Sequence, residues 1–301
     1  MAMAQSDQFE SRQPSSVEEI RKLDRSYFVK RMVGRVIVYA ILIFLTMVCL
    51  LPFYSMIISA THSNSDIATK LLLLPGGQLL ANYHRLMQTV NVWRGFGNSI
   101  VIAVSSTVLS LYFSALTAYG FAKYRFKGSK LLFGSVLASM MVPGQLGIIG
   151  FFQLMHGFHM LNTYWPLILP SIANAFGVFF LKQICDESIT DELIEAARID
   201  GASEVRIFHR LALPLLMPGM SALAIFFFIG NWNSFLNPLI ILFDNNLQPL
   251  PVMIAMTQGS NFTDYGAQYV GVAISVVPII IVFAILSKRI IGGLSVGSLK
   301  G

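Results

Sequence analysis

The stretch Asp191–Pro218, DELIEAARIDGASEVRIFHRLALPLLMP, is the only long charged segment between apolar runs in the second half of the chain. It is patterned as two short helices that meet at Gly201. Asp191 and Glu192 put negative charge into a first helical turn, where the helix dipole favours it. Glycine is the usual left-handed residue just after a helix. The stretch therefore predicts a helix-turn-helix.

The ends of both predicted helices are marked by capping and breaking residues. Candidate N-caps are Thr190 or Ser188 for the first helix and Ser203 for the second. Leu193, Ala196 and Ala197 are expected to form one small, flat face. Pro214 and Pro218 are expected to stop the second helix and begin the next apolar run.

The rest of the chain has the composition of a membrane protein. Of its 301 residues, 55% are hydrophobic and 12% are charged, against roughly 25% charged in a soluble domain. Six apolar runs are about 20 residues long, the length that crosses a bilayer. They are Val36–Ala60, Gly97–Ala122, Leu131–Met155, Thr163–Leu181, Pro218–Leu242 and Tyr269–Leu286. The predicted fold is all-α, a polytopic membrane protein with six transmembrane helices and a helix-turn-helix between helices 4 and 5.

The apolar runs contain no Asp, Glu, Lys or Arg. Ionisable residues inside a membrane mark proton relays and ion sites, so their absence from the runs argues against a secondary transporter or a channel. Every histidine lies outside the runs, which argues against an intramembrane hydrolase. Cys49 and Cys185 lie far apart in depth, so neither a disulfide framework nor a metal site is expected.

Basic residues are distributed unevenly about the six runs. Of the 21 lysines and arginines, 18 fall on one side, and only Lys70, Arg85 and Arg94 fall on the other. The positive-inside rule then places both termini and residues 182–217 in the cytoplasm. The expected organisation is a cytoplasmic tail with an interfacial helix (1–35), a transmembrane domain (36–290) and a glycine-rich cytoplasmic tail (291–301).

Polar and helix-breaking residues mark two of the runs. Pro143 and Gly144 interrupt the third run, which suits either a helix that lines a pathway or a close helix contact. The fifth run holds an indole and three amides: Asn231, Trp232, Asn233 and Asn237. These groups either bond neighbouring helices together or line a polar path suited to a hydroxyl-rich ligand.

The spacing inside the opening stretch is Glu195-Ala196-Ala197, three residues, Gly201, nine residues, then Leu211-Ala212-Leu213-Pro214. It resembles the cytoplasmic EAA loop of permease subunits of bacterial ABC importers. The family pattern ends Ile-x-Leu-Pro, and Leu211 stands in place of Ile. Thr190 stands where carbohydrate-type members usually have Pro.

Further motifs narrow this resemblance to the shorter permease subunit of maltose-type carbohydrate importers. They are EAARIDGAS at 195–203, Trp232-Asn233-x-Phe235, Pro143-Gly144-Gln145 and the tail ending Leu299-Lys300-Gly301. The resemblance extends from the first run to the C-terminus.

The resemblance implies a role for the helix-turn-helix as a coupling loop that docks on an ATP-binding subunit. Glu195 would pair with a cation of the ATPase, Ala196 and Ala197 would allow close approach, and Gly201 would set the bend. The coupling set also includes Asp200, Leu213 and Pro214. The tail residues Leu299, Lys300 and Gly301 would contact the ATPase subunits. An outer loop would contact the binding protein through Gly259, Ser260, Asn261 and Tyr265.

The resemblance also implies the partners. They are a second permease subunit, two ATP-binding subunits and an extracytoplasmic solute-binding protein in a bacterial inner membrane. ATP and magnesium would reside on the ATPase, because this chain has no Gly-Lys-Ser or Gly-Lys-Thr. The implied cargo is a sugar or oligosaccharide. Acidic oligosaccharides of the alginate type and glycerol phosphates remain alternatives.

Overall fold

The structure is a computed structural model that describes residues 13–258 and 263–297. Regular structure in these residues is helical, apart from one isolated bridge between Gln258 and Thr263. Five helices are long and apolar enough to cross a membrane, or six if the bent pair Ser129–Met140 and Gly144–Gly157 forms one span. The predicted fold class is confirmed.

Helix α1 (Gln13–Ala60) runs unbroken through the predicted interfacial segment and the first apolar run. The chain divides into two units after Met56, and most of α1 forms the first unit. From residue 31 to 55 its side chains are exposed, although residues 31–60 are strongly apolar. A helix that is hydrophobic all round suits a lipid environment.

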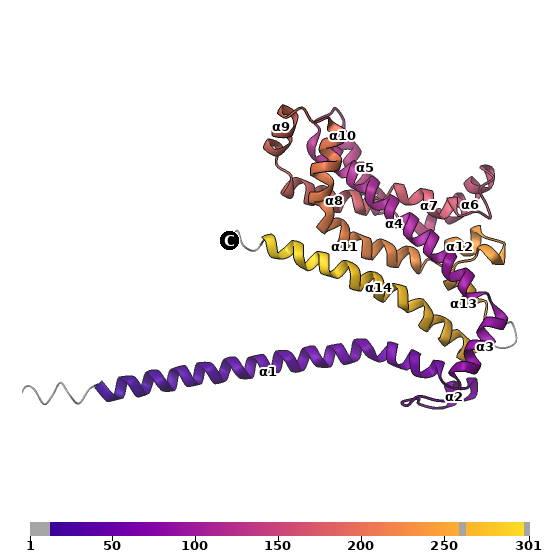
Figure 1. Ribbon diagram of the computed structural model, residues 1–301, viewed down its shortest axis with the longest axis horizontal. Coiled ribbons are helices and arrows are strands. Elements are labelled where there is room, and N and C mark those ends of the chain that lie inside the picture. Colours follow the sequence, from indigo (N-terminus) through magenta and orange to yellow (C-terminus); the bar gives the residue numbers. More distant parts are fainter. Residues whose placement is uncertain (1–12, 259–262, 298–301) are drawn as a thin grey trace, which may run out of the picture. The chain divides into compact units, whose positions relative to one another are not determined.

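Four long helices form the centre of the second unit. They are α4 (Val92–Lys123), α8 (Ala175–Ser188), α11 (Leu213–Trp232) and α14 (Tyr265–Gly297). Helix α4 packs against α8 and α11, and α14 packs along α11 (Figure 1). The approach of α4 and α8 is close, since a Cβ atom on Gly177 would overlap the hydroxyl of Ser114. Small residues bring membrane helices together in this way.

The third and fourth spans are both broken. The third consists of α5 (Ser129–Met140), η2 (Gly144–Gly147) and α6 (Ile148–Gly157), with a bend of 90°. The predicted interruption at Pro143 and Gly144 is therefore confirmed. The fourth consists of α7 (Trp165–Ile168), η3 (Leu169–Ile172) and α8.

A ladder of serines on α4 satisfies carbonyls in the broken fourth span. The hydroxyl of Ser110 donates to the carbonyl of Ser171 at 2.7 Å. Its neighbours one turn away, Ser106 and Ser114, donate to Leu167 at 3.3 Å and Asn174 at 3.4 Å. Irregular backbone is tolerated inside a membrane only when other protein groups satisfy it.

The predicted boundaries of the fifth span are wrong. Pro214 and Pro218 do not stop the preceding helix: α10 (Glu204–Ile207), the π-helical turn η4 (Phe208–Ala212) and α11 form one continuous span up to Trp232. Proline at position 214 removes one backbone donor, and the turn widens so that the Leu213 amide bonds the Phe208 carbonyl. The chain then breaks and resumes as α12 (Leu236–Ile241).

Short elements occupy opposite ends of this helix bundle (Figure 1). At the Lys123 end of α4 lie α9 (Asp191–Ile199) and α10. At the Val92 end lie α2 (Asn64–Thr69), α3 (Leu79–Thr89), η5 (Asn245–Leu247) and α13 (Leu250–Ala255).

Candidate functional site

Helices α9 and α10 form a hairpin, residues 191–207, that turns at Gly201. Gly201 has a φ of +79°, as predicted. Its amide bonds the Arg198 carbonyl at 3.0 Å, and the Ala202 amide bonds the Ala197 carbonyl at 3.0 Å. These two bonds define a Schellman motif, which fixes the direction in which the chain leaves a helix.

The N-cap positions of the hairpin are also those predicted. Thr190 and Ser203 occupy them with extended backbone, but neither side chain makes a capping hydrogen bond. The start of each helix therefore depends more on packing than on its cap.

One side of the hairpin packs on the bundle. Ile194, Ile207 and Phe208 are buried in an apolar cluster with residues of α4, α8 and α11. Ala197 is half-buried against the same cluster, whereas Leu193 and Ala196 are exposed. The flat face predicted for Leu193, Ala196 and Ala197 is thus divided between the two sides.

The other side of the hairpin is open. Glu195, Ala196, Asp200 and Gly201 are exposed, and so are two large apolar side chains, Ile199 at 86% and Val205 at 69%. Further along, Leu213 is half-buried and Pro214 is exposed in the first turn of α11. Carboxylates next to bare apolar surface make a face suited to a protein partner.

A polar cavity of about 390 Å³ lies between the broken spans and the end of α11. Two of the predicted pathway residues, Asn231 and Asn237, line it. Its other polar side chains come from Ser110, Ser171, Asn174 and Ser234, and Gly144 and Gly147 contribute bare backbone. None of the described residues that line it has an ionisable side chain.

The amides in this cavity have unused hydrogen-bonding groups. The Asn231 side-chain nitrogen donates to the Phe227 carbonyl at 2.8 Å, which leaves its oxygen free to accept. Within the described residues, the side chains of Ser234 and Asn237 make no hydrogen bond. Such groups match the hydroxyls of a sugar.

The other two predicted pathway residues lie elsewhere. Trp232 is buried at 1% exposure, stacks on Phe228 and donates from its indole nitrogen to the Ser275 carbonyl of α14 at 3.0 Å. Asn233 is exposed and does not line the cavity. Trp232 thus bonds α11 to α14. Of the two roles that the sequence left open, it bonds neighbouring helices and does not line the polar path.

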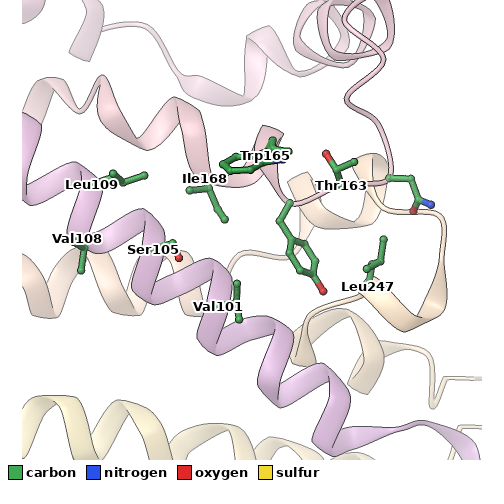
Figure 2. Close-up of a pocket in the computed structure, with 10 residues that line it drawn as sticks. Val101, Ser105, Val108, Leu109, Thr163, Trp165, Ile168 and Leu247 are labelled. Carbon is green, nitrogen blue, oxygen red and sulfur yellow. The ribbon is translucent and has the colours of Figure 1, made fainter.

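Another cavity, of about 770 Å³, is of a different kind. It opens between α4 and α7, and Figure 2 shows its lining, which is mainly aliphatic and also includes Trp165, Ser105 and Thr163. Val101, Val108 and Trp165 are exposed apolar residues. This surface suits hydrocarbon rather than a sugar.

At the opposite end of the bundle, an ion pair holds the start of α14. The Arg85 Nε donates to Asp264 at 2.7 Å. Burial raises the pKa of Asp264, but hydrogen bonds from Arg85 and the Ala267 amide lower the pKa by more, and it lies below its usual value. Tyr265 is exposed beside this pair. The other predicted contacts there, Gly259, Ser260 and Asn261, and the tail residues Leu299, Lys300 and Gly301, lie outside the described residues.

Comparison with known proteins identifies the class of this helix bundle. Residues 110–295, from the middle of α4 through the hairpin and nearly all of α14, match the family "Binding-protein-dependent transport system inner membrane component". The chain belongs to this family. It is therefore a multi-pass transport subunit of the inner membrane.

Two curated permeases and one solved structure are similar over most of their length. An arabinooligosaccharide transport permease of Halalkalibacterium halodurans is 34% identical over 86% of this chain and 94% of its own. A diacetylchitobiose uptake permease of Streptomyces coelicolor is 33% identical over 87% and 88%. A bacterial ABC transporter involved in import of the acidic polysaccharide alginate has the same fold, with a TM-score of 0.73 and 24% identity over 86% of this chain and 96% of its own.

Sequence reasoning missed four polar residues of the permease cavity, Ser110, Ser171, Asn174 and Ser234. Two of them, Asn174 and Ser234, lie next to breaks in the helices. Asn174 caps α8, its side chain accepting from the Gly177 amide at 2.8 Å, and the preceding Pro170 signals the break. Ser234 lies in the break after α11. The sequence predicted one unbroken span at this point, from Pro218 to Leu242. A Ser or Asn beside a break in an apolar run is the signal that identifies both.

Proposed function

We propose that this chain forms half of the translocation pathway of an ABC importer for neutral oligosaccharides. The α9–α10 hairpin transmits ATP hydrolysis on separate subunits to the helix bundle. ATP and magnesium are held by those subunits, and a second permease subunit completes the pathway. A soluble binding protein delivers the sugar at the opposite end.

The observation that carries the coupling role is the open face of the hairpin. Glu195 and Ala196 stand exposed beside a rigid Schellman turn, with Ile199 and Val205 bare next to them. Small residues allow close approach, and one carboxylate can fix the register with a cation of the partner. Closure of two ATPase subunits would then move the hairpin and open the pathway alternately to each side.

The orientation follows from charge. Eighteen of the 21 lysines and arginines fall on the hairpin side of the apolar runs. By the positive-inside rule, the hairpin and both termini are cytoplasmic, and the end with Arg85 and Tyr265 faces the binding protein.

The sugar class is supported by the cavity and by the relatives. Its polar lining consists of amides and hydroxyls, with no charged side chain among the described residues that line it. Two relatives are named for arabinooligosaccharide transport and diacetylchitobiose uptake. A carboxylate or phosphate would meet no cation there, which disfavours acidic oligosaccharides and glycerol phosphates.

The coupling role is tested by reversing one charge. In the complete transporter in proteoliposomes, Glu195→Lys is expected to leave assembly intact and to abolish uptake and binding-protein-stimulated ATP hydrolysis. Glu187→Lys is the matched control, because Glu187 is also exposed at this end but precedes the hairpin. Uptake by the Glu195 variant at the level of the control would overturn the assignment.

A further inference from the structure

Three side chains join the hairpin to the end of α4. Tyr124 is the residue at which α4 ends, and its hydroxyl donates to one carboxylate oxygen of Glu204 on α10. The other oxygen of Glu204 accepts from Arg198 Nε on α9 at 2.7 Å. We call Tyr124, Arg198 and Glu204 the Tyr124 cluster.

The cluster closes the hairpin and attaches it in one arrangement. Arg198 and Glu204 stand on either side of Gly201, so their ion pair joins α9 to α10 across the turn. Tyr124 then connects the closed hairpin to α4. Burial and the Glu204 carboxylate raise the pKa of Tyr124, so the hydroxyl keeps the proton that it donates.

A second contact lies beside the cluster. Lys123 Nζ lies 3.1 Å from Asp191 Oδ1 at the start of α9, and the Lys123 side chain is 7% exposed. Both arms of the hairpin are therefore bonded to consecutive residues at the end of α4. Beneath them, the ring of Tyr119 packs on Phe208 with centroids 5.5 Å apart.

These contacts connect the hairpin mechanically to α4, to which it is not joined directly along the chain. Along the chain, the hairpin is continuous only with α8 and with α11. Helix α4 lines the polar cavity with Ile102 and Ser110, and its serine ladder bonds the broken fourth span. A hairpin fixed to α4 therefore acts on the wall of the cavity.

Stability is not the main consequence of the cluster. The Arg198 and Glu204 side chains are 44% and 47% exposed, and exposed ion pairs contribute little to stability. The buried apolar cluster holds the hairpin on the bundle, whereas the polar contacts fix its orientation.

We propose that Tyr124, with Glu204 and Arg198, is a positioning group that makes the hairpin and α4 move as one body, so that hairpin displacement reaches the sugar cavity. This inference rests on the proposed coupling function. It assigns to the end of α4 a part in coupling ATP hydrolysis to sugar movement.

The first test removes one hydroxyl. In the complete transporter with binding protein, Tyr124→Phe is expected to assemble and to hydrolyse ATP at the basal rate. The number of sugar molecules imported per ATP is expected to fall about threefold to tenfold, the range for loss of one ordinary hydrogen bond. Glu204→Gln keeps a hydrogen-bond acceptor for Tyr124. It is therefore expected to import more sugar molecules per ATP than Glu204→Ala does.

The matched control is Asp186→Asn. It breaks the Lys182–Asp186 pair, which lies at the same end of the bundle but within one helix, and it is expected to keep the wild-type ratio. A wild-type ratio in Tyr124→Phe, or an equal fall in the control, would overturn the inference. If Glu195→Lys still abolishes uptake in that case, the proposed function stands without it.

The second test replaces the contact by a covalent link. Tyr124→Cys and Glu204→Cys are combined in a background with Cys49→Ser and Cys185→Ala, and a short bifunctional thiol reagent joins them. Before linking, the double-cysteine variant is expected to import fewer sugar molecules per ATP than the transporter with only Cys49→Ser and Cys185→Ala. Linking is expected to raise the number of sugars per ATP toward the value of that transporter. Unchanged or lower import after linking contradicts a hairpin and α4 that move together.

Discussion

At the scale of single residues, Gly201 determines the direction of the exposed hairpin. Its left-handed backbone costs an ordinary L-residue roughly 1–2 kcal/mol. No atom lies within 4 Å of the position that a Cβ would occupy. The requirement for glycine is therefore conformational, not steric.

We predict that Gly201→Ala lowers the unfolding free energy by about 1 kcal/mol and reduces uptake, because alanine is strained in the left-handed conformation that the Schellman turn requires. Gly201→Asn is expected to cost less, since asparagine tolerates the left-handed region. Thermal unfolding and uptake of the purified transporter measure both. Gly134→Ala on α5, also with open space around it, is the control, and equal effects at 134 and 201 contradict the prediction.

The structural role of a residue was predictable from the sequence when that role depends only on its neighbours along the chain. The turn at Gly201 follows from its position after a charged helix, and the structure confirms it. The burial of Trp232 was not predictable, because a helix that is apolar all round does not reveal which side faces a neighbour. The coupling roles of Glu195 and Ala196 stay predictions.

At the scale of elements, the broken helices create the polar cavity. The bend between α5 and α6 places Gly144 and Gly147 opposite the amides at the end of α11. The break at Pro143 was predictable because proline removes a backbone donor. The continuation of α10 into α11 was not, since a π-helical turn absorbs Pro214 without ending the helix.

Filling the cavity from η2 tests its place in the pathway. Nothing lies within 4 Å of a Cβ on Gly147, so Gly147→Leu is expected to fold normally and to project into the cavity. We expect uptake to fall at least about tenfold, a barrier increase of about 1.4 kcal/mol. Gly150→Leu has similar open space but does not line the cavity, and it is expected to transport normally. Normal uptake in Gly147→Leu places the sugar path elsewhere.

At the scale of the whole molecule, most lysines and arginines lie on the hairpin side of the apolar runs. The described residues that line the cavity carry no charge. Arg85, at the end opposite the hairpin, is already paired with Asp264, so it offers little attraction to an acidic ligand. The membrane class was predictable because it depends on composition, whereas the sidedness stays a prediction from basic-residue counts. The precise cargo was not predictable, because in the proposed transporter a second permease subunit would contribute the other half of the pathway.

Neutral and acidic sugars are expected to differ in the assembled transporter. Neutral di- and trisaccharides should stimulate ATP hydrolysis through the binding protein, whereas oligouronates and glycerol phosphates should not, because no cation in the cavity repays their desolvation. Stimulation across such a panel, with binding-protein affinity measured separately, gives the comparison. Stronger stimulation by an oligouronate at matched binding would contradict a neutral cargo.

The serine ladder also bears on how the protein is made. Leu167 and Ser171 lie at the break in the fourth span, and their carbonyls accept hydrogen bonds from Ser106 and Ser110 of α4. In lipid those carbonyls would have no other partner, and each unsatisfied group is costly. The fourth span thus depends on α4 being already in the bilayer. The order of synthesis, α4 before α7 and α8, supplies that partner in time for membrane integration.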